Sequence, residues 1–482
     1  MRPLRTLARN SFYLAVANGV QLTAQLVFAG LLARHFGTIG FGRFAFVLSV
    51  VAFAEAIVRP AASTIVTREV SRNRGEASAI FWPSVLAQTA GGLFVTALSY
   101  LIVAVGANLS AQQSSAALCT AALVAGCTAA ARLLTDVPVA VSRGMDRMYW
   151  EAAITAIERT LFLFLFVAVV LRFRADIVAV FEAGLTSQLF IAAVSLAVAI
   201  RLLKPPAPDW HTARKLVFAS LPLMAYGILS GFHWRFDTIV LQHFAGEHQV
   251  GVFGAPFKLL EAFRALPWLL LMAAFPTLAR QAKTDRSALR RSYTLAFRFV
   301  LLASIPIAIL LFVFAEPIVL LVFSSRFTES VLPLRLLAVA IVPLCLNWLF
   351  NYMSLCVDRQ DLIPWMYVAA SVPHLAAAVL LVPRLGAAGA ALSFLTAEAV
   401  LCIVGFIFMS RCISPVRAGD VLKPIASAVV ASGVLVVMRG HDPLRVGLAS
   451  VGAYCGALLA VPFFARHRFV SGLLSLITGR QP

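Results

Sequence analysis

The chain consists of long apolar stretches separated by short polar segments. Fourteen of these stretches have the length that crosses a bilayer as a helix, which is roughly 20 residues. They are residues 11–33, 41–58, 81–105, 115–134, 152–171, 177–203, 215–241, 250–275, 293–314, 332–357, 362–382, 385–409, 421–438 and 444–464. Leu, Val, Ala and Phe follow one another in them without alternation, so the strands of a membrane barrel do not fit. The pattern predicts an all-α polytopic membrane protein with about 14 transmembrane helices.

Composition agrees with this prediction and excludes a water-soluble globule. Hydrophobic residues make up 61% of the 482 residues, charged residues only 13%, and the mean hydropathy is +0.90. The basic amino terminus followed by an apolar stretch has the outline of a signal peptide. That stretch is too long and lacks a small-residue cleavage site, so we expect it to be retained as the first span.

The formal net charge is +19, with 40 Lys and Arg against 21 Asp and Glu. The basic residues concentrate in short loops on the side of the amino terminus, for example Arg68, Arg72 and Arg74, or Arg290 and Arg291. This asymmetry predicts that both termini are cytoplasmic, which agrees with an even number of spans. Because the basic residues flank spans and form no domain of their own, they predict contact with anionic lipids and no nucleic-acid binding.

The sequence lacks the common motifs of catalysis. It has no G-x-x-x-x-G-K-[ST] loop for ATP hydrolysis, no H-E-x-x-H and no G-x-S-x-G. The seven cysteines form no C-x-x-C pair and lie in or beside apolar stretches, where packing is their expected role. His233 and Asp237 share one helical face, but no clear third ligand completes a metal site. We therefore expect no cofactor, no metal and no enzyme activity, and the expected function is transport.

A short internal repeat indicates two similar halves. Residues 33–37 read ARHFG and precede GFG at 40–42, whereas residues 241–245 read LQHFA and precede GVFG at 251–254. The two copies lie six spans apart, so both halves have the same orientation, which is a known transporter design with the substrate path between the halves. The expected domains are a first lobe of six spans at 1–203, a second at 204–410, and two additional spans with a cytoplasmic tail at 411–482.

Three segments carry a recurrent pattern of Gly, Phe and Pro with one Asp. They are RNSFYLAVANGVQLTAQLVFAGLLARHFGTIGFGRFAFVLS at the amino terminus, FDTIVLQHFAGEHQVGVFGAPFKLLEAFRALPWLLLMAAFPTLAR in the middle, and PRLGAAGAALSFLTAEAV in the twelfth span. With these segments the chain resembles the Wzx-type oligosaccharide flippases, the polysaccharide transporter branch of the MOP superfamily. The resemblance covers nearly the whole chain.

The resemblance implies a fold and a function. The fold has two six-helix lobes, similar to those of MATE transporters, around a V-shaped cavity, with two extra carboxyl-terminal helices. The function is translocation of undecaprenyl-diphosphate-linked oligosaccharides from the cytoplasmic to the periplasmic leaflet of the bacterial inner membrane, for O-antigen, capsule or exopolysaccharide synthesis. Coupling to H⁺ or Na⁺ and association with a polysaccharide polymerase or export complex stay open.

Charged side chains within the predicted spans are the candidate site residues. A charge at mid-bilayer costs about 2.5–3.5 kcal/mol, so such residues are expected to face protein or water. Guanidinium groups bind phosphate oxygens in bidentate fashion, which suits a lipid diphosphate. The candidate substrate-binding cations are Arg59, Arg159, Arg235, Lys258, Arg264 and Arg335. The candidate coupling or charge-balancing acids are Glu55, Glu158, Asp237, Glu261 and Glu398.

Spacing separates these candidates further. Arg235 and Asp237 are two residues apart, hence about 200° around a helix, and cannot pair on one face. Lys258, Glu261 and Arg264 are spaced by three and predict one charged stripe, which either lines a substrate path or only locks neighbouring helices.

Glu55 and Arg59, four residues apart, predict a local salt bridge. Arg335 lies close enough to a span end to extend its charge into the interface. Two functional alternatives remain beside the flippase. One is a MATE-like ion-coupled exporter of small molecules, against which the excess of Arg and Lys argues. The other is a membrane polymerase or ligase, which the absence of a large periplasmic loop disfavours.

Overall fold

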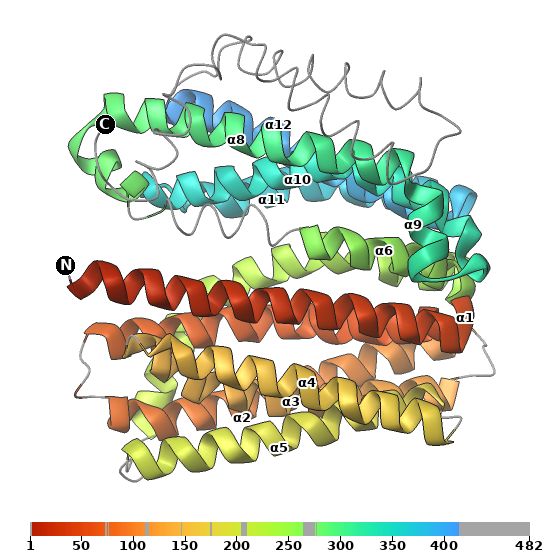
Figure 1. Ribbon diagram of the computed structural model, residues 1–482, viewed down its shortest axis with the longest axis horizontal. Coiled ribbons are helices and arrows are strands. Elements are labelled where there is room, and N and C mark those ends of the chain that lie inside the picture. Colours follow the sequence, from red (N-terminus) through yellow and green to blue (C-terminus); the bar gives the residue numbers. More distant parts are fainter. Residues whose placement is uncertain are drawn as a thin grey trace. The chain divides into compact units, whose positions relative to one another are not determined.

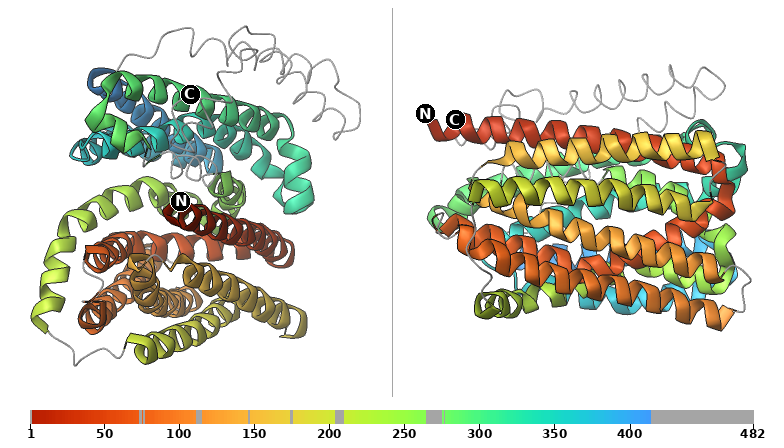
Figure 2. Two further views of the ribbon diagram at one scale, coloured as in Figure 1. Left: turned by 60° about the vertical axis from the view of Figure 1, so that its left-hand side comes forward. Right: turned by 90° about the horizontal axis from the view of Figure 1, so that it is seen from below.

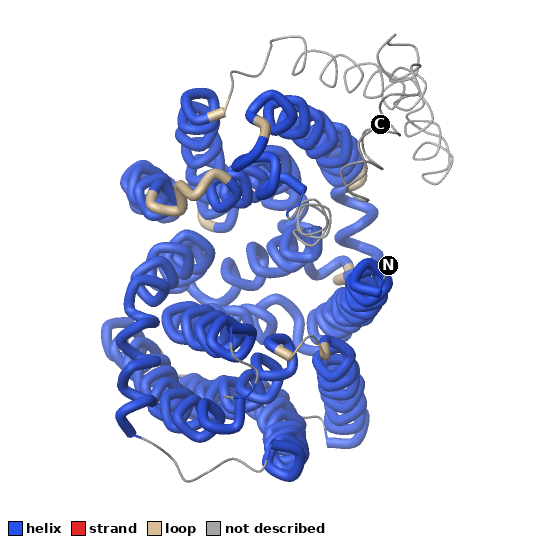
Figure 3. Tube along the Cα trace, turned by 90° about the vertical axis from the view of Figure 1, so that its left-hand side faces the viewer, coloured by secondary structure: helices blue, strands red, loops and turns tan. Residues whose placement is uncertain are grey.

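The computed structural model describes residues 2–72, 75, 77–110, 115–145, 147–173, 176–203, 210–263, 275 and 277–413. Every regular element in this part of the chain is a helix (Figure 3). Eight of these helices are long and apolar enough to cross a membrane, or up to nine if a pair bent by 49° within residues 210–262 is one span. The predicted class, an all-α polytopic membrane protein, is therefore confirmed.

The helices follow the predicted spans closely. In chain order they are α1 (Arg2–Arg72), α2 (Ala77–Ser110), α3 (Ser115–Gly144), α4 (Met148–Phe173), α5 (Ile177–Leu203), α6 (Trp210–Phe263), α8 (Arg286–Val313), α9 (Ala315–Val322), the 3₁₀ helix η2 (Ser325–Ser330), α10 (Val331–Cys356), α11 (Leu362–Leu385) and α12 (Ala387–Cys412) (Figure 1). Each of the twelve predicted spans between residues 11 and 409 falls on these helices where the structure describes it. The predicted spans 421–438 and 444–464 lie outside the described residues.

The chain groups into two compact units, which we call unit 1 (Met1–Gly254) and unit 2 (Ala255–Pro482). This grouping places most of α6 with α1 to α5. The predicted lobe boundary between residues 203 and 204 stays a prediction.

Two glycines bend the two longest helices at corresponding points. Gly37 divides α1 with φ 66° and ψ −167°, and Gly246 divides α6 with φ 77° and ψ −178°. Only glycine adopts this backbone conformation at low cost, because a Cβ would clash with the neighbouring peptide groups. The His-Phe pair of the internal repeat precedes each bend, at His35 and at His243. Where the sequence predicts separate spans joined by loops, the structure has two spans joined by a single bent residue.

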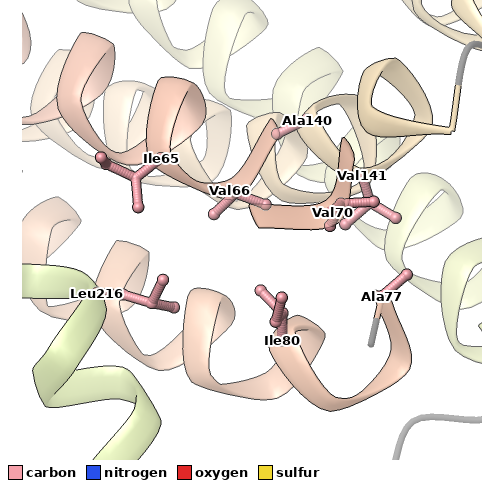
Figure 4. Close-up of a cluster of buried hydrophobic side chains, with 8 residues drawn as sticks. All are labelled: Ile65, Val66, Val70, Ala77, Ile80, Ala140, Val141 and Leu216. Carbon is pink, nitrogen blue, oxygen red and sulfur yellow. The ribbon is translucent and has the colours of Figure 1, made fainter. Parts of the chain in front are cut away.

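In unit 1 the helices α1 to α5 lie side by side, with α3 packed against α1, α2 and α5 (Figure 2). An apolar cluster joins the end of α1, the start of α2, the end of α3 and the first arm of α6 (Figure 4). Its members include Ile65, Ile80, Val141 and Leu216, all less than 10% exposed. The cluster begins less than two turns beyond Arg59 on α1, so it fixes the helices that carry the charged residues described below.

In unit 2, α10 packs against α8 and α12, and α11 packs against α12. Aromatic rings fill this interior, with Phe297 of α8 stacked on Phe350 of α10 at 6.4 Å between ring centroids.

Candidate functional site

Six charged side chains gather where α1, α3 and α4 pack together in unit 1. Two come from each helix, and we call them the six-charge network. They are Glu55 and Arg59 of α1, Arg132 and Asp136 of α3, and Glu158 and Arg159 of α4.

Two ion pairs connect α1 to α3. Arg59 Nε donates to Asp136 Oδ2 at 2.7 Å, and Arg59 Nη2 donates to Oδ1 at 3.4 Å, so the guanidinium holds both oxygens. Arg132 Nη1 lies 3.5 Å from Glu55 Oε2. On α1 the acid Glu55 and the base Arg59 lie four residues apart, and on α3 Arg132 and Asp136 have the same spacing. The two side chains on each helix therefore point to the same side of that helix. The two helices are thereby joined by two successive charge pairs.

The α4 pair completes the network. Arg159 Nη1 lies 3.9 Å from Glu158 Oε1. Glu158 interacts electrostatically with Arg59, and Arg159 interacts with Arg132 and Arg59. Three arginines thus face three carboxylates, and the formal charge of the network is zero.

Exposure differs sharply among the members of the network. The side chains of Glu55, Asp136 and Glu158 are only 10%, 15% and 14% exposed. Arg132 and Arg159 are 25% and 23% exposed, whereas Arg59 is 44% exposed.

Some buried atoms of the network have no hydrogen-bond partner among the described residues. They are Glu55 Oε1, Arg132 Nε and Arg159 Nε. Buried polar groups usually find a partner, so these atoms leave capacity for water or a ligand. The network can therefore present a cation to an approaching anion while its carboxylates stay behind.

The predicted local bridge between Glu55 and Arg59 is wrong. Each residue pairs across to α3, because the close packing of α1 and α3 places oppositely charged groups nearer than the next turn of the same helix. Arg132 and Asp136 were not among the predicted site residues, since Asp136 lies just beyond the predicted span 115–134. Their spacing of four, the same as that of Glu55 and Arg59, was the available signal.

A second feature of unit 1 is a crossing between the arms that follow the two bends, which we call the helix crossing. Thr38 Oγ1 lies 2.9 Å from His248 Nδ1, and Arg43 Nε donates to Glu247 Oε2 at 2.7 Å. The backbones meet at Gly42, where an added Cβ would lie 1.8 Å from the Glu247 carbonyl oxygen. Reciprocally, a Cβ on Gly251 would lie 1.9 Å from the carbonyl oxygen of Thr38. Both glycines belong to the internal repeat, although the sequence alone did not predict their contact.

The other predicted residues of α6 occupy different environments. Asp237 is 3% exposed and Arg235 is half-buried, which fits their predicted placement on different sides of the helix. Lys258 Nζ donates to Glu261 Oε2 at 2.7 Å within unit 2, so these two residues form a one-turn ion pair. Arg264 lies outside the described residues. The roles of these residues in binding or coupling stay predictions.

Unit 2 holds a buried carboxylate on α12. Glu398 is 2% exposed and accepts a hydrogen bond from Asn347 Nδ2 of α10 at 2.7 Å. The same amide nitrogen donates to the Glu398 backbone oxygen at 3.0 Å. On α10, Arg335 is half-buried, and its Nε has no hydrogen-bond partner among the described residues. The described part of the chain contains no group of three His, Cys, Asp or Glu residues able to hold a metal ion.

Comparison with known proteins identifies the family and the fold. The family model described as "Polysaccharide biosynthesis protein" matches residues 7–282. No curated protein sequence matches the chain. The structure of the lipid II flippase MurJ in an inward closed conformation is similar, with a TM-score of 0.78 and 12% identity, over 98% of this chain and 100% of that chain.

Two further solved structures share this fold. An inward-facing multidrug resistance MATE family transporter of the MOP superfamily has a TM-score of 0.67 and 17% identity, over 82% of this chain and 94% of that chain. A MOP superfamily transporter from Pyrococcus furiosus with a binding pocket of reverse polarity has a TM-score of 0.56 and 17% identity, over 86% of this chain and 96% of that chain. The chain therefore has the fold of MOP superfamily transporters.

Proposed function

Because the chain belongs to the polysaccharide biosynthesis protein family and has the MOP transporter fold, we propose that it is a flippase. It moves undecaprenyl-diphosphate-linked oligosaccharide repeat units from the cytoplasmic to the periplasmic leaflet of the bacterial inner membrane. The product serves the synthesis of O-antigen, capsule or exopolysaccharide. The fold likeness to MurJ, a lipid II flippase, supports a lipid-linked substrate.

The observation that carries the proposal is the position of Arg59 in the six-charge network. Its side chain is 44% exposed although it pairs with Asp136, so part of the guanidinium remains open to a ligand. A guanidinium has five N–H donors in a planar fork that matches phosphate oxygens. A diphosphate approaching the network thus meets a cation before it meets the three buried carboxylates. Arg132 and Arg159, whose Nε atoms have no hydrogen-bond partner among the described residues, offer further N–H donors to the anion.

Alternating exposure of the site requires a closed and an open end. The helix crossing closes the end of unit 1 at the Gly37 and Gly246 bends, which the predicted topology places on the periplasmic side. Its separation opens the outward path. Proton or Na⁺ coupling would use the buried acids Asp237 or Glu398, which are 3% and 2% exposed.

Deletion of the gene tests the function. The surface or secreted polysaccharide should disappear, and the lipid-linked oligosaccharide should accumulate on the cytoplasmic leaflet. If single repeat units reach the periplasm and fail only to polymerise, a polymerase or ligase is the better assignment. The orientation is tested by a reporter that is active only in the periplasm, fused after Pro482, which should be silent.

Substitutions at Arg59 test the site itself. Arg59→Gln should reduce export at normal membrane abundance, and Arg59→Lys should restore part of it, because the charge returns without the bidentate fork. Arg201→Gln is the matched control, since Arg201 is an exposed arginine in the last turn of α5. Equal export by the Arg59 and Arg201 variants would remove Arg59 from the substrate site.

The three carboxylates of the network favour one alternative, an ion-coupled exporter of small cations with the MATE fold. A cation requires the acids and not the arginines. Under that alternative Asp136→Asn abolishes transport, Arg59→Gln is tolerated, and deletion of the gene causes sensitivity to cationic compounds with the polysaccharide unchanged.

A further inference from the structure

A cavity of about 440 Å³ lies in unit 2 where three segments end together. The segments are the first turn of α8 with the helical residues just before it, the end of α10 with the residues that follow it, and the end of α12. Arg290 Nε of α8 donates to the backbone oxygen of Ile413 at 2.9 Å and holds the end of α12 against α8. We call this cavity the terminal pocket. It is separate from the six-charge network, all of whose residues lie in unit 1.

The terminal pocket is lined by four cations and one acid. The cations are Lys283, Arg286, Arg359 and Arg411, and the acid is Asp358. Lys283 and Asp358 are 3.9 Å apart and more than 70% exposed, so their pairing contributes little. Among the described residues, neither Arg286 nor Arg411 has an ion-pair partner. Arg359 pairs with Asp361 at 3.2 Å, so the uncompensated charge of the lining is that of Arg286 and Arg411.

Arg286 and Arg411 are exposed side chains at opposite ends of their helices. Arg411, in the last turn of α12, is explained by the helix dipole alone, because the end of a helix favours a cation. Arg286 is the first residue of α8, where the positive end of the dipole disfavours a cation. An anion bound between Arg286 and Arg411 would neutralise both side chains. The α8 amino terminus itself is capped by the Asp285 carboxylate, which accepts from the backbone N–H groups of Ser287 and Ala288.

The inner wall of the pocket is apolar. Leu289, Cys356 and Ile413 line it and are 4%, 2% and 6% exposed. A wall of this kind suits an anion that carries an apolar portion. All three segments lie on the side that the basic loops predict to be cytoplasmic, where anionic lipids are abundant.

We propose that the terminal pocket binds a phosphate-bearing anion, with the phosphate held by Arg286, Arg411 and Arg359. The source that fits the apolar wall is the headgroup of an anionic phospholipid; free phosphate offers the same chemistry without the apolar portion. Asp358, the one acid among the described lining residues, pairs with Lys283 and repels an anion in the pocket. The proposal concerns a site distinct from substrate transport and stands whether or not the flippase assignment holds.

The test measures ligand binding by the purified full chain in neutral detergent. Phosphatidylglycerol, phosphatidylcholine and inorganic phosphate are titrated separately, and binding is followed by native mass spectrometry and by the shift in melting temperature. The wild type should bind phosphatidylglycerol and not phosphatidylcholine. The Arg286→Gln/Arg411→Gln double variant should bind phosphatidylglycerol about tenfold more weakly or worse, because two charge-assisted contacts are lost. Arg384→Gln, an exposed arginine in the last turn of α11, is the control and should bind normally.

A second variant gives an effect that misfolding cannot produce. Asp358→Asn should tighten binding, because it removes the carboxylate that lines the pocket and repels the anion. Asp358 has a φ of 56°, which asparagine also adopts readily, so the backbone is retained. Binding of inorganic phosphate with the same dependence on these variants would support the site and assign it to a soluble ligand. Unchanged phosphatidylglycerol binding by the double variant, or equal loss in Arg384→Gln, would overturn the proposal.

Discussion

Replacing Gly42 by alanine should separate the helix crossing and reduce export. The added Cβ would lie 1.8 Å from the Glu247 carbonyl oxygen and 2.9 Å from its carbon. Backbone atoms cannot rotate away as a flexible side chain can. The second arm of α1 and the second arm of α6 must therefore move apart.

The size of the effect follows from these distances. Ordinary contact begins at 3.4 Å, so the two arms must separate by roughly 1.5 Å. That movement stretches the contact of Arg43 with Glu247 at 2.7 Å, and that of Thr38 with His248 at 2.9 Å, beyond useful hydrogen-bond length. Overpacking costs about 1–3 kcal/mol, and the two lost contacts add roughly 1–3 kcal/mol. Since 1.4 kcal/mol is a tenfold change, the closed crossing should lose population by a factor of about 30 to about 20,000.

Two assays report this change. Labelling of an Ala45→Cys variant, with the native cysteines replaced, by a membrane-impermeant maleimide should increase when Gly42→Ala is added, because Ala45 is buried against Gly254 across the crossing and makes neither of the two contacts. Polysaccharide export, normalised to membrane abundance, should fall, because alternating exposure needs both conformations. Gly106→Ala is the matched control, since a Cβ at Gly106 meets nothing within 4 Å. Both variants make the same chemical change within a helix, so a difference between them isolates the crossing.

One outcome would refute the reasoning. If Gly42→Ala labels and exports as the wild type does, the close approach of the two backbones does not limit the transport cycle. Failure of both glycine variants to reach the membrane would instead point to an effect on folding. The Arg43→Gln variant then tests the crossing without adding volume, and it should show increased labelling with normal abundance.

Three further predictions follow from individual contacts. Arg132→Gln leaves Glu55 buried without its ion-pair partner, which costs up to about 3–5 kcal/mol; the melting temperature should fall and should recover when Glu55→Gln is added. Arg235→Ala should reach the membrane at normal abundance but lose export, with Arg235→Lys partly active; full export by the alanine variant would exclude a role in the site. Hydrogen bonds from Ala288 N–H and from Ser287 lower the pKa of Asp285. The Asp285 cap on α8 is therefore complete above about pH 4 and is lost as the pH falls through the lowered pKa. Hydrogen exchange of the first α8 turn, corrected for intrinsic rates, should rise in that pH range in the wild type and not in Asp285→Asn.

The positions of the spans could be predicted because they depend on local composition. A membrane helix satisfies its own backbone hydrogen bonds, so a sufficiently long apolar stretch specifies it without reference to the rest of the chain. The bends were harder to predict. A repeated His-Phe pair precedes both bends in the sequence, but the same residues could equally precede a loop. Gly246 also lies one residue beyond Ala245, which aligns with Gly37 in the internal repeat.

The candidate site was predicted only in part, for a physical reason. The sequence named four members of the six-charge network, because a charge in an apolar stretch is conspicuous. The sequence paired Glu55 with Arg59, because the spacing of residues on a single helix indicates only which side chains on neighbouring turns can contact each other. Arg132 and Asp136 change that pairing only when α3 lies against α1.

From the amino-acid sequence alone one can therefore derive that the chain lies in a bilayer, that it is helical, and which residues carry most of the buried charges. Each of these follows from the free energy of placing a residue in a bilayer, which depends on that residue and its neighbours in the chain. Only the tertiary structure decided which charges pair, which cation remains exposed, and that Gly42 meets the residue 247 backbone. These features depend on how helices that are distant in the sequence pack. Two residues on different helices contribute no interaction energy until packing brings them into contact.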